Sequence, residues 1–106
     1  MNTDNYVLDK AVGVTFGDRQ NTIRTLKSGD TLKLIKEPDN QYDKTAVRIE
    51  TEDGRQVGYV KRDSWLTKVI YEKNFLPKAE VHQIVGGGEE GRALGVVMKV
   101  LKEAAD

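Results

Sequence analysis

Residues 37–46 of the chain read Glu37-Pro38-Asp39-Asn40-Gln41-Tyr42-Asp43-Lys44-Thr45-Ala46. The segments on either side, Thr31–Lys36 and Ala46–Thr51, alternate apolar and polar residues, which predicts two β-strands with one buried face each. The connection is longer than a minimal hairpin turn, and Pro38 disfavours a helix within it. We therefore expect a structured loop held at both ends by strands.

The chemistry of this loop fits two roles. Tyr42 is a large aromatic residue among polar ones, with the carboxylate of Asp43 beside it. An aromatic face with converging polar groups, on a loop held by strands, is a common way to build a binding site. In the alternative, Tyr42 covers one end of a barrel, while Asp39, Asn40 and Asp43 only cap the turn. Local chemistry by itself favours this alternative, a purely structural role.

Four further segments have the alternation or the β-branched content of strands. They are Lys10–Phe16, Gln56–Lys61, Ala79–Val85 and Leu94–Leu101. In the first of them, alternation predicts that Val12, Val14 and Phe16 share the core face. The dipeptide Asp53-Gly54 is a strong hairpin signal, so the strand Ala46–Thr51 should turn directly into the next one.

The spacing of apolar residues changes from two to 3.6 in one long segment. Asp63 is a candidate N-cap, and the apolar residues that follow predict a helix over Asp63–Lys73. We expect Trp65 to pack between this helix and the strands, and a shorter helical piece over Asn21–Lys27. Most connections are too short for parallel crossovers. The predicted fold is therefore mainly β: a six-stranded antiparallel OB- or SH3-like barrel with one helix between strands 4 and 5.

Length and composition set further bounds. A chain of 106 residues forms one domain, and we expect a polar N-terminal segment over residues 1–9, the barrel over residues 10–101 and a tail over residues 102–106. The chain has no Cys and one His, His82, which excludes disulfides and makes a zinc site improbable. Without a membrane-spanning run or a signal-peptide core, a cytoplasmic protein is the default expectation.

Charge and motifs argue against several function classes. The 17 basic and 17 acidic residues cancel, so no global field attracts polyanions, although a small basic groove stays compatible with this balance. No P-loop, dinucleotide-binding fingerprint or HExxH motif is present. Asp39 and Asp43 could act as an acid/base pair in principle, but both lie on a solvated loop. We expect no enzyme activity, no cofactor and no metal.

Several blocks of this sequence together resemble the HIRAN domain family. They are Ala11–Phe16 (AVGVTF), Leu34–Val47 (LIKEPDNQYDKTAV), Gly54–Val60 (GRQVGYV), and Val85-Gly86-Gly87 followed by Gly95-Val96-Val97. The resemblance covers about Lys10 to Leu101 and implies a small stand-alone member of the family. It implies a non-catalytic module that binds nucleic acid, namely single-stranded DNA with a preference for 3′ ends, in a DNA-repair or mobile-element context.

The resemblance also implies roles for individual residues. The base-stacking aromatic residues of the family fall on Phe16 and Tyr42. The carboxylate that meets the terminal hydroxyl falls on Asp43. An adjacent amide-type contact falls on Asn40 or Asp39, and the phosphate-binding residue falls on Arg62 or its neighbour Lys61.

Three departures from the family pattern support a different function. Thr15 stands where a DNA-binding member has Arg, Tyr59 stands where it has His, and the Gly86–Gly88 loop lacks the aromatic residue found there. These positions would supply two phosphate contacts and one stacking wall. The alternative is therefore a protein-interaction β-barrel that has kept the HIRAN fold and lost DNA-end binding, with a protein partner in place of DNA.

Overall fold

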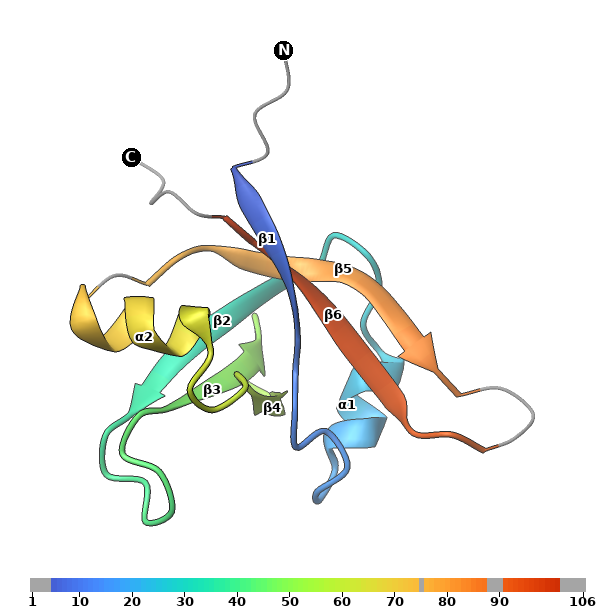
Figure 1. The fold of residues 1–106 in the computed structure, drawn as a ribbon. Helices are drawn as coiled ribbons and strands as arrows, with labels where there is room; N and C mark the ends of the chain where they lie inside the picture. Colours follow the sequence, from blue (N-terminus) through green and yellow to red (C-terminus); the bar gives the residue numbers. More distant parts are fainter. Residues whose placement is uncertain (1–4, 75, 88–90, 102–106) are drawn as a thin grey trace.

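The computed structural model of the chain describes residues 5–74, 76–87 and 91–101. Within these residues six strands form one antiparallel sheet, in the order β1-β6-β5-β2-β3-β4 (Figure 1). The elements are β1 (Tyr6–Lys10), α1 (Arg19–Arg24), β2 (Thr31–Glu37), β3 (Ala46–Thr51), β4 (Gln56–Tyr59), α2 (Trp65–Glu72), β5 (Ala79–Gly86) and β6 (Leu94–Leu101). The predicted mainly β fold, with six antiparallel strands and a helix between strands 4 and 5, is confirmed.

The sheet curls until its two edges nearly meet, but it does not close as the predicted barrel would. β1 and β4 are the edge strands. Beyond β1, the backbone of Val12 exchanges two hydrogen bonds with that of Tyr59 in β4, at 2.8 and 2.9 Å, in an isolated bridge. Gly58 permits this contact, because a Cβ atom there would lie 2.6 Å from the carbonyl oxygen of Val12.

The first strand ends earlier than predicted. Its pairing with β6 spans Tyr6–Lys10, and the expected strand Lys10–Phe16 is wrong. Gly13 adopts φ +66°, which a strand does not allow, and the chain turns away there. As a result, Val12 and Phe16 are 41% and 65% exposed, and only Val14 of the predicted core face packs against the core.

The core forms where alternation and helical spacing predicted it. Leu32 and Leu34 of β2 and Val47 and Ile49 of β3 are buried. The helices close the two ends of this core through Ile23 of α1, Leu66 and Ile70 of α2. β6 adds Val96, Met98 and Val100, and β5 adds Val81.

The start of α2 differs from the prediction in two ways. Its N-cap is Ser64, whose Oγ accepts a hydrogen bond from the backbone N–H of Thr67 at 3.2 Å, whereas Asp63 lies outside the helix with φ +61°. Trp65 is 48% exposed, so its expected packing between helix and strands is wrong in large part. α2 buries Leu66, Thr67 and Ile70 instead.

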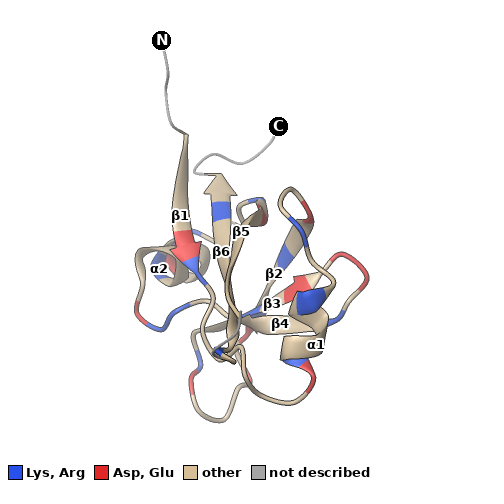
Figure 2. Cartoon of the chain, turned by 90° about the vertical axis from the view of Figure 1, so that its right-hand side faces the viewer, with Lys and Arg blue, Asp and Glu red and all other residues tan. Residues whose placement is uncertain are grey.

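Charged residues of both signs are dispersed over the strands, helices and loops of the chain (Figure 2). This dispersal matches the balance of 17 basic and 17 acidic residues. None of the helices in the described residues has the length and apolarity required to cross a membrane.

Candidate nucleic-acid interface

A groove of about 470 Å³ opens where three parts of the chain meet. One wall is the segment 12–19 that follows β1, another is the loop 40–46, and the floor is the end of β4 with residues 60–62. In Figure 1 the two loops extend from the same end of the sheet. Most residues predicted for the site line this groove: Phe16, Asn40, Tyr42, Asp43, Tyr59 and Arg62.

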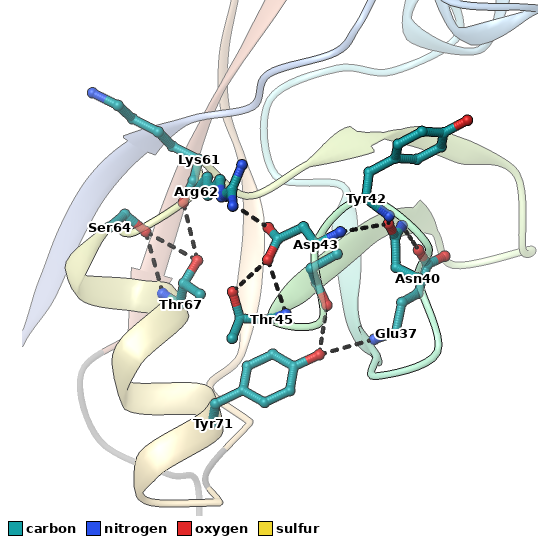
Figure 3. Close-up of polar contacts among 11 residues, drawn as sticks. Glu37, Asn40, Tyr42, Asp43, Thr45, Lys61, Arg62, Ser64, Thr67 and Tyr71 are labelled. Carbon is teal, nitrogen blue, oxygen red and sulfur yellow. Dashed lines mark hydrogen bonds and ion pairs between the residues drawn. The ribbon is translucent and has the colours of Figure 1, made fainter.

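The other three predicted site residues do not line the groove. Thr15, Asp39 and Lys61 are exposed. Asp39 lies at a separate hollow with Lys36 and Pro38. Figure 3 shows the side chain of Lys61 directed away from Asp43, while that of Arg62 is directed toward it. Of the alternatives left open by the sequence, the groove therefore contains Asn40 and Arg62.

Asn40 organises the loop through its side-chain amide. Its Oδ1 accepts hydrogen bonds from the backbone N–H groups of Tyr42 at 2.8 Å and Asp43 at 3.0 Å. Its Nδ2 donates to Oε1 of Glu37 at 2.9 Å. This is the local side-chain-to-backbone bonding that Asn favours in turns. Asn40 thus fixes the backbone from which Tyr42 and Asp43 project.

Tyr42 is 87% exposed, and its ring projects outward from the loop (Figure 3). The structural alternative, in which Tyr42 covers one end of the fold, is therefore wrong. An aromatic ring held by an ordered backbone and open to solvent offers its face for stacking. Phe16, across the groove, is 65% exposed and offers a second ring.

The two oxygens of the Asp43 carboxylate have different partners. Its Oδ1 accepts from the backbone N–H of Thr45 at 2.9 Å and from the Thr45 hydroxyl at 2.7 Å. These bonds from Thr45 lower the pKa of Asp43, and Arg62 adds a smaller electrostatic contribution. Its Oδ2 lies 3.9 Å from Nε of Arg62 (Figure 3). The carboxylate is therefore ionised at neutral pH, and its Oδ2 faces Arg62 in a long ion pair.

The carboxylate of Glu37, at the end of β2, connects Tyr59 on the floor of the groove with Asn40 in the loop. Oε1 of Glu37 accepts a hydrogen bond from the Tyr59 hydroxyl at 2.8 Å, and Oε2 is paired with Arg48. Burial acts to raise the pKa of Glu37, but the hydrogen bonds from Asn40, Tyr59 and Arg48 outweigh it and lower that pKa. Burial, and then the bond to Glu37, raises the pKa of Tyr59.

Tyr71 of α2 joins the two ends of the loop. Its hydroxyl donates to the carbonyl oxygen of Ala46 at 2.7 Å and accepts from the backbone N–H of Glu37 at 3.1 Å (Figure 3). The sequence contained no signal for this contact, because Tyr71 lies far along the chain from the loop. The helix therefore holds the loop closed at its base.

Arg19 is a groove residue that the sequence analysis missed. Its guanidinium carbon lies 5.5 Å from the centre of the Phe16 ring and 5.4 Å from that of Tyr59. Its Nη1 donates to the carbonyl oxygen of Gly13 at 2.5 Å. In the part of the chain that the structure describes, Arg19 forms no salt bridge with a carboxylate. The sequence signal that could have identified Arg19 as a groove residue is its position three residues after Phe16.

No metal site is assembled in the described part of the groove. Among the described residues no group of three or more His, Asp or Glu side chains could hold a metal ion.

The predicted loop Gly86–Gly88 lies partly outside the described residues. Its described part, Gly86 and Gly87, continues from β5, and the N–H of Gly87 bonds to the carbonyl oxygen of Arg92 at 3.1 Å.

Comparison with known proteins identifies the class to which this sheet and groove belong. The model of the HIRAN domain matches residues 9–97, and the chain therefore belongs to the HIRAN domain family. Domains of this family are in general DNA-binding modules. No match to the chain is found among the curated proteins.

Two solved structures share the fold. The HIRAN domain of human HLTF is 20% identical, with a TM-score of 0.61 over 91% of this chain and 74% of that one. A protein from Lactobacillus plantarum, solved by a structural genomics consortium, is also 20% identical, with a TM-score of 0.62 over 92% of this chain and 97% of that one. At this identity the likeness establishes the fold alone.

Proposed function

We propose that this domain binds single-stranded DNA in the groove, without catalysis, and prefers a free 3′ end. The observation that carries the proposal is the convergence of two exposed rings, two cations and one ionised carboxylate in a single open groove. The residues are Phe16, Tyr42, Arg19, Arg62 and Asp43.

The two rings supply affinity that does not depend on base identity. Phe16 and Tyr42 stand on different walls of the groove, and both are largely exposed. Stacking of a base on an aromatic side chain contributes roughly 1–3 kcal/mol. Unstacked bases are available in single strands and not inside a duplex. The rings therefore favour a single strand over double-stranded DNA.

The cations supply the attraction for phosphate. Arg62 is 70% exposed in its side chain and is held near Asp43 without a close ion pair. Thr15 has no charge to offer a phosphate. Arg19 provides a cation in the groove instead, since its guanidinium lies against the rings of Phe16 and Tyr59. Arg is well suited to phosphate, since its planar fork offers several donors. Arg19 therefore compensates for one of the departures from the family pattern.

Asp43 supplies the preference for an end. An ionised carboxylate accepts a hydrogen bond from a sugar hydroxyl but repels a phosphodiester. A terminal nucleotide offers such a hydroxyl, and an internal nucleotide does not. The choice of the 3′ end over the 5′ end follows from the family resemblance. A role in DNA repair or in mobile elements, and a cytoplasmic location, stay predictions.

Fluorescence anisotropy with labelled oligonucleotides tests this proposal. At low salt, wild-type protein should bind a single strand with a free 3′ hydroxyl more tightly than the same strand with a 3′ phosphate, and more tightly than a blunt duplex. Equal, salt-insensitive and weak binding to all three ligands would contradict the proposal. The exposed rings would then support the protein-interaction alternative.

A further inference from the structure

A second hollow, of about 620 Å³, lies beside the groove and shares Phe16 and Arg19 with it. Its remaining walls are α1 with the residues on either side of it, and Arg55 and Gln56 at the start of β4. None of the residues that the family resemblance implicates, apart from Phe16, lines this second hollow. It is therefore a surface without an assigned role.

We propose that the second hollow holds the nucleotide on the 5′ side of the terminal one, so that the bound strand crosses the ridge formed by Phe16 and Arg19. This inference rests on the proposed function, because it extends the same strand beyond the groove. It predicts a binding site longer than one nucleotide, with Arg55 as a phosphate contact that the first groove does not use.

The groove and the second hollow adjoin each other. Phe16 and Arg19 line both hollows, so a ligand that stacks on Phe16 in the groove lies at the entrance of the second hollow. A strand whose 3′ hydroxyl meets Asp43 can continue only in the 5′ direction. The second hollow is adjacent to the groove at the exposed Phe16 ring, which gives the strand a direct route.

The charged residues of the second hollow are mainly basic. Arg19 and Arg55 both line the second hollow, and Asp18 is the carboxylate among the residues that line it. Arg55 is paired with Asp53 at 3.2 Å, but the two side chains are 47% and 66% exposed. Exposed pairs of this kind contribute little to stability, so a phosphate can take the place of Asp53 at little cost.

The polar side chains of α1 and of its C-cap residue fit a sugar–phosphate backbone better than a protein core. Asn21 and Thr25 are exposed and line the hollow together with Thr22. Hydroxyl and amide groups are common partners of phosphate and sugar oxygens. Phe16 is the aromatic residue that lines the hollow. The hollow therefore suits the backbone of a strand whose base stacks at the ridge.

NMR titration with a length series of oligodeoxynucleotides tests this inference. The series runs from a nucleoside 5′-monophosphate to a hexanucleotide, each with a free 3′ hydroxyl, and compares wild type with Arg55→Gln. We expect Arg55→Gln to leave binding of the mononucleotide unchanged and to weaken binding of the trinucleotide and longer ligands by about twofold to fivefold, the range for an exposed ion pair. Its log–log salt slope should be shallower by about 0.7, the value for one lost contact to a single strand.

Two further variants separate the possible results. Lys33→Gln removes an exposed cation of β2 that lines neither hollow and should match wild type at every length. Tyr42→Ala reports on the first groove. If Tyr42→Ala weakens binding while Arg55→Gln matches wild type at all lengths, the second hollow is not used and the inference is overturned. If Tyr42→Ala also has no effect, the proposed function fails, and the inference fails with it.

Discussion

The hydroxyl of Tyr59, at the end of β4, donates a hydrogen bond of 2.8 Å to Oε1 of Glu37, at the end of β2. The same oxygen accepts from Asn40, whose amide holds the backbone of Tyr42 and Asp43. One carboxylate therefore connects the floor of the groove to the loop above it. The phenol of Tyr59 reaches Glu37, while its ring centre lies 5.4 Å from the guanidinium carbon of Arg19.

Tyr59→Phe should test this connection. The variant keeps the ring beside Arg19 and removes the hydrogen bond to Glu37, so we expect a loss of about 0.5–1.5 kcal/mol in the free energy of unfolding. Urea denaturation measures this loss. Tyr6→Phe is the matched control, because the Tyr6 hydroxyl makes no hydrogen bond in the described residues. Equal stability of Tyr59→Phe and wild type would show that the bond contributes nothing.

Glu37 should make stability depend on acid pH. Its folded-state pKa lies below the ordinary value of 4.5, so its stabilisation is fully present above that pH and is lost as the pH falls through the folded value. Glu37→Gln removes this contribution, and we expect it to cost about 1–3 kcal/mol at neutral pH.

Denaturation of both proteins at a series of pH values checks this prediction. The gap in unfolding free energy between wild type and Glu37→Gln should narrow below about pH 4.5. Asp43 and Asp53 also have lowered pKa values and will titrate in both proteins, so only the difference between the two curves reports on Glu37. A gap that stays constant down to acid pH would contradict the prediction.

Tyr42→Ala should weaken binding of single-stranded DNA by roughly 1–3 kcal/mol through lost stacking. Because the Tyr42 ring is 87% exposed, its removal should change the unfolding free energy by less than about 0.5 kcal/mol. Anisotropy titration and urea denaturation measure the two effects. Leu8→Ala removes another exposed apolar side chain, which lies on β1 outside the groove, and should bind as wild type does. A large loss of stability in Tyr42→Ala would assign the ring a structural role.

Asp43→Asn should reduce the preference for a free end more than it reduces total affinity. The amide oxygen can still accept from Thr45, so the loop is retained, whereas the charge that repels phosphate is gone. The ratio of affinities for 3′-hydroxyl and 3′-phosphate strands should fall toward one, with tighter binding of the phosphate strand. Glu80→Gln controls for the change in net charge, since Glu80 lies on β5 outside both hollows. An unchanged ratio would remove Asp43 from the end-binding role.

Most of the strands and both helices could be predicted from local sequence patterns. Alternation placed Leu32, Leu34, Val47 and Ile49 in the core, because a strand at the surface of a core repeats every two residues. The same reasoning failed at Phe16. Alternation of apolar and polar residues does not reveal where a strand ends in a turn. Gly13 ends the extended backbone by adopting φ +66°. Phe16 follows that turn and is therefore exposed to solvent instead of packed in the core.

Some features of the candidate site could likewise be predicted from the sequence, and others could not. The sequence by itself determined the strands β2 to β6, the loop 37–46 and the residues of that loop that line the groove, because periodicity and turn chemistry are properties of neighbouring residues. Only the tertiary structure decided that Arg19 lies against Phe16 and Tyr59, that Tyr71 holds the loop at its base, and that a second hollow adjoins the groove. These contacts join segments far apart in the chain, and their geometry depends on how the curled sheet brings β1 and β4 together.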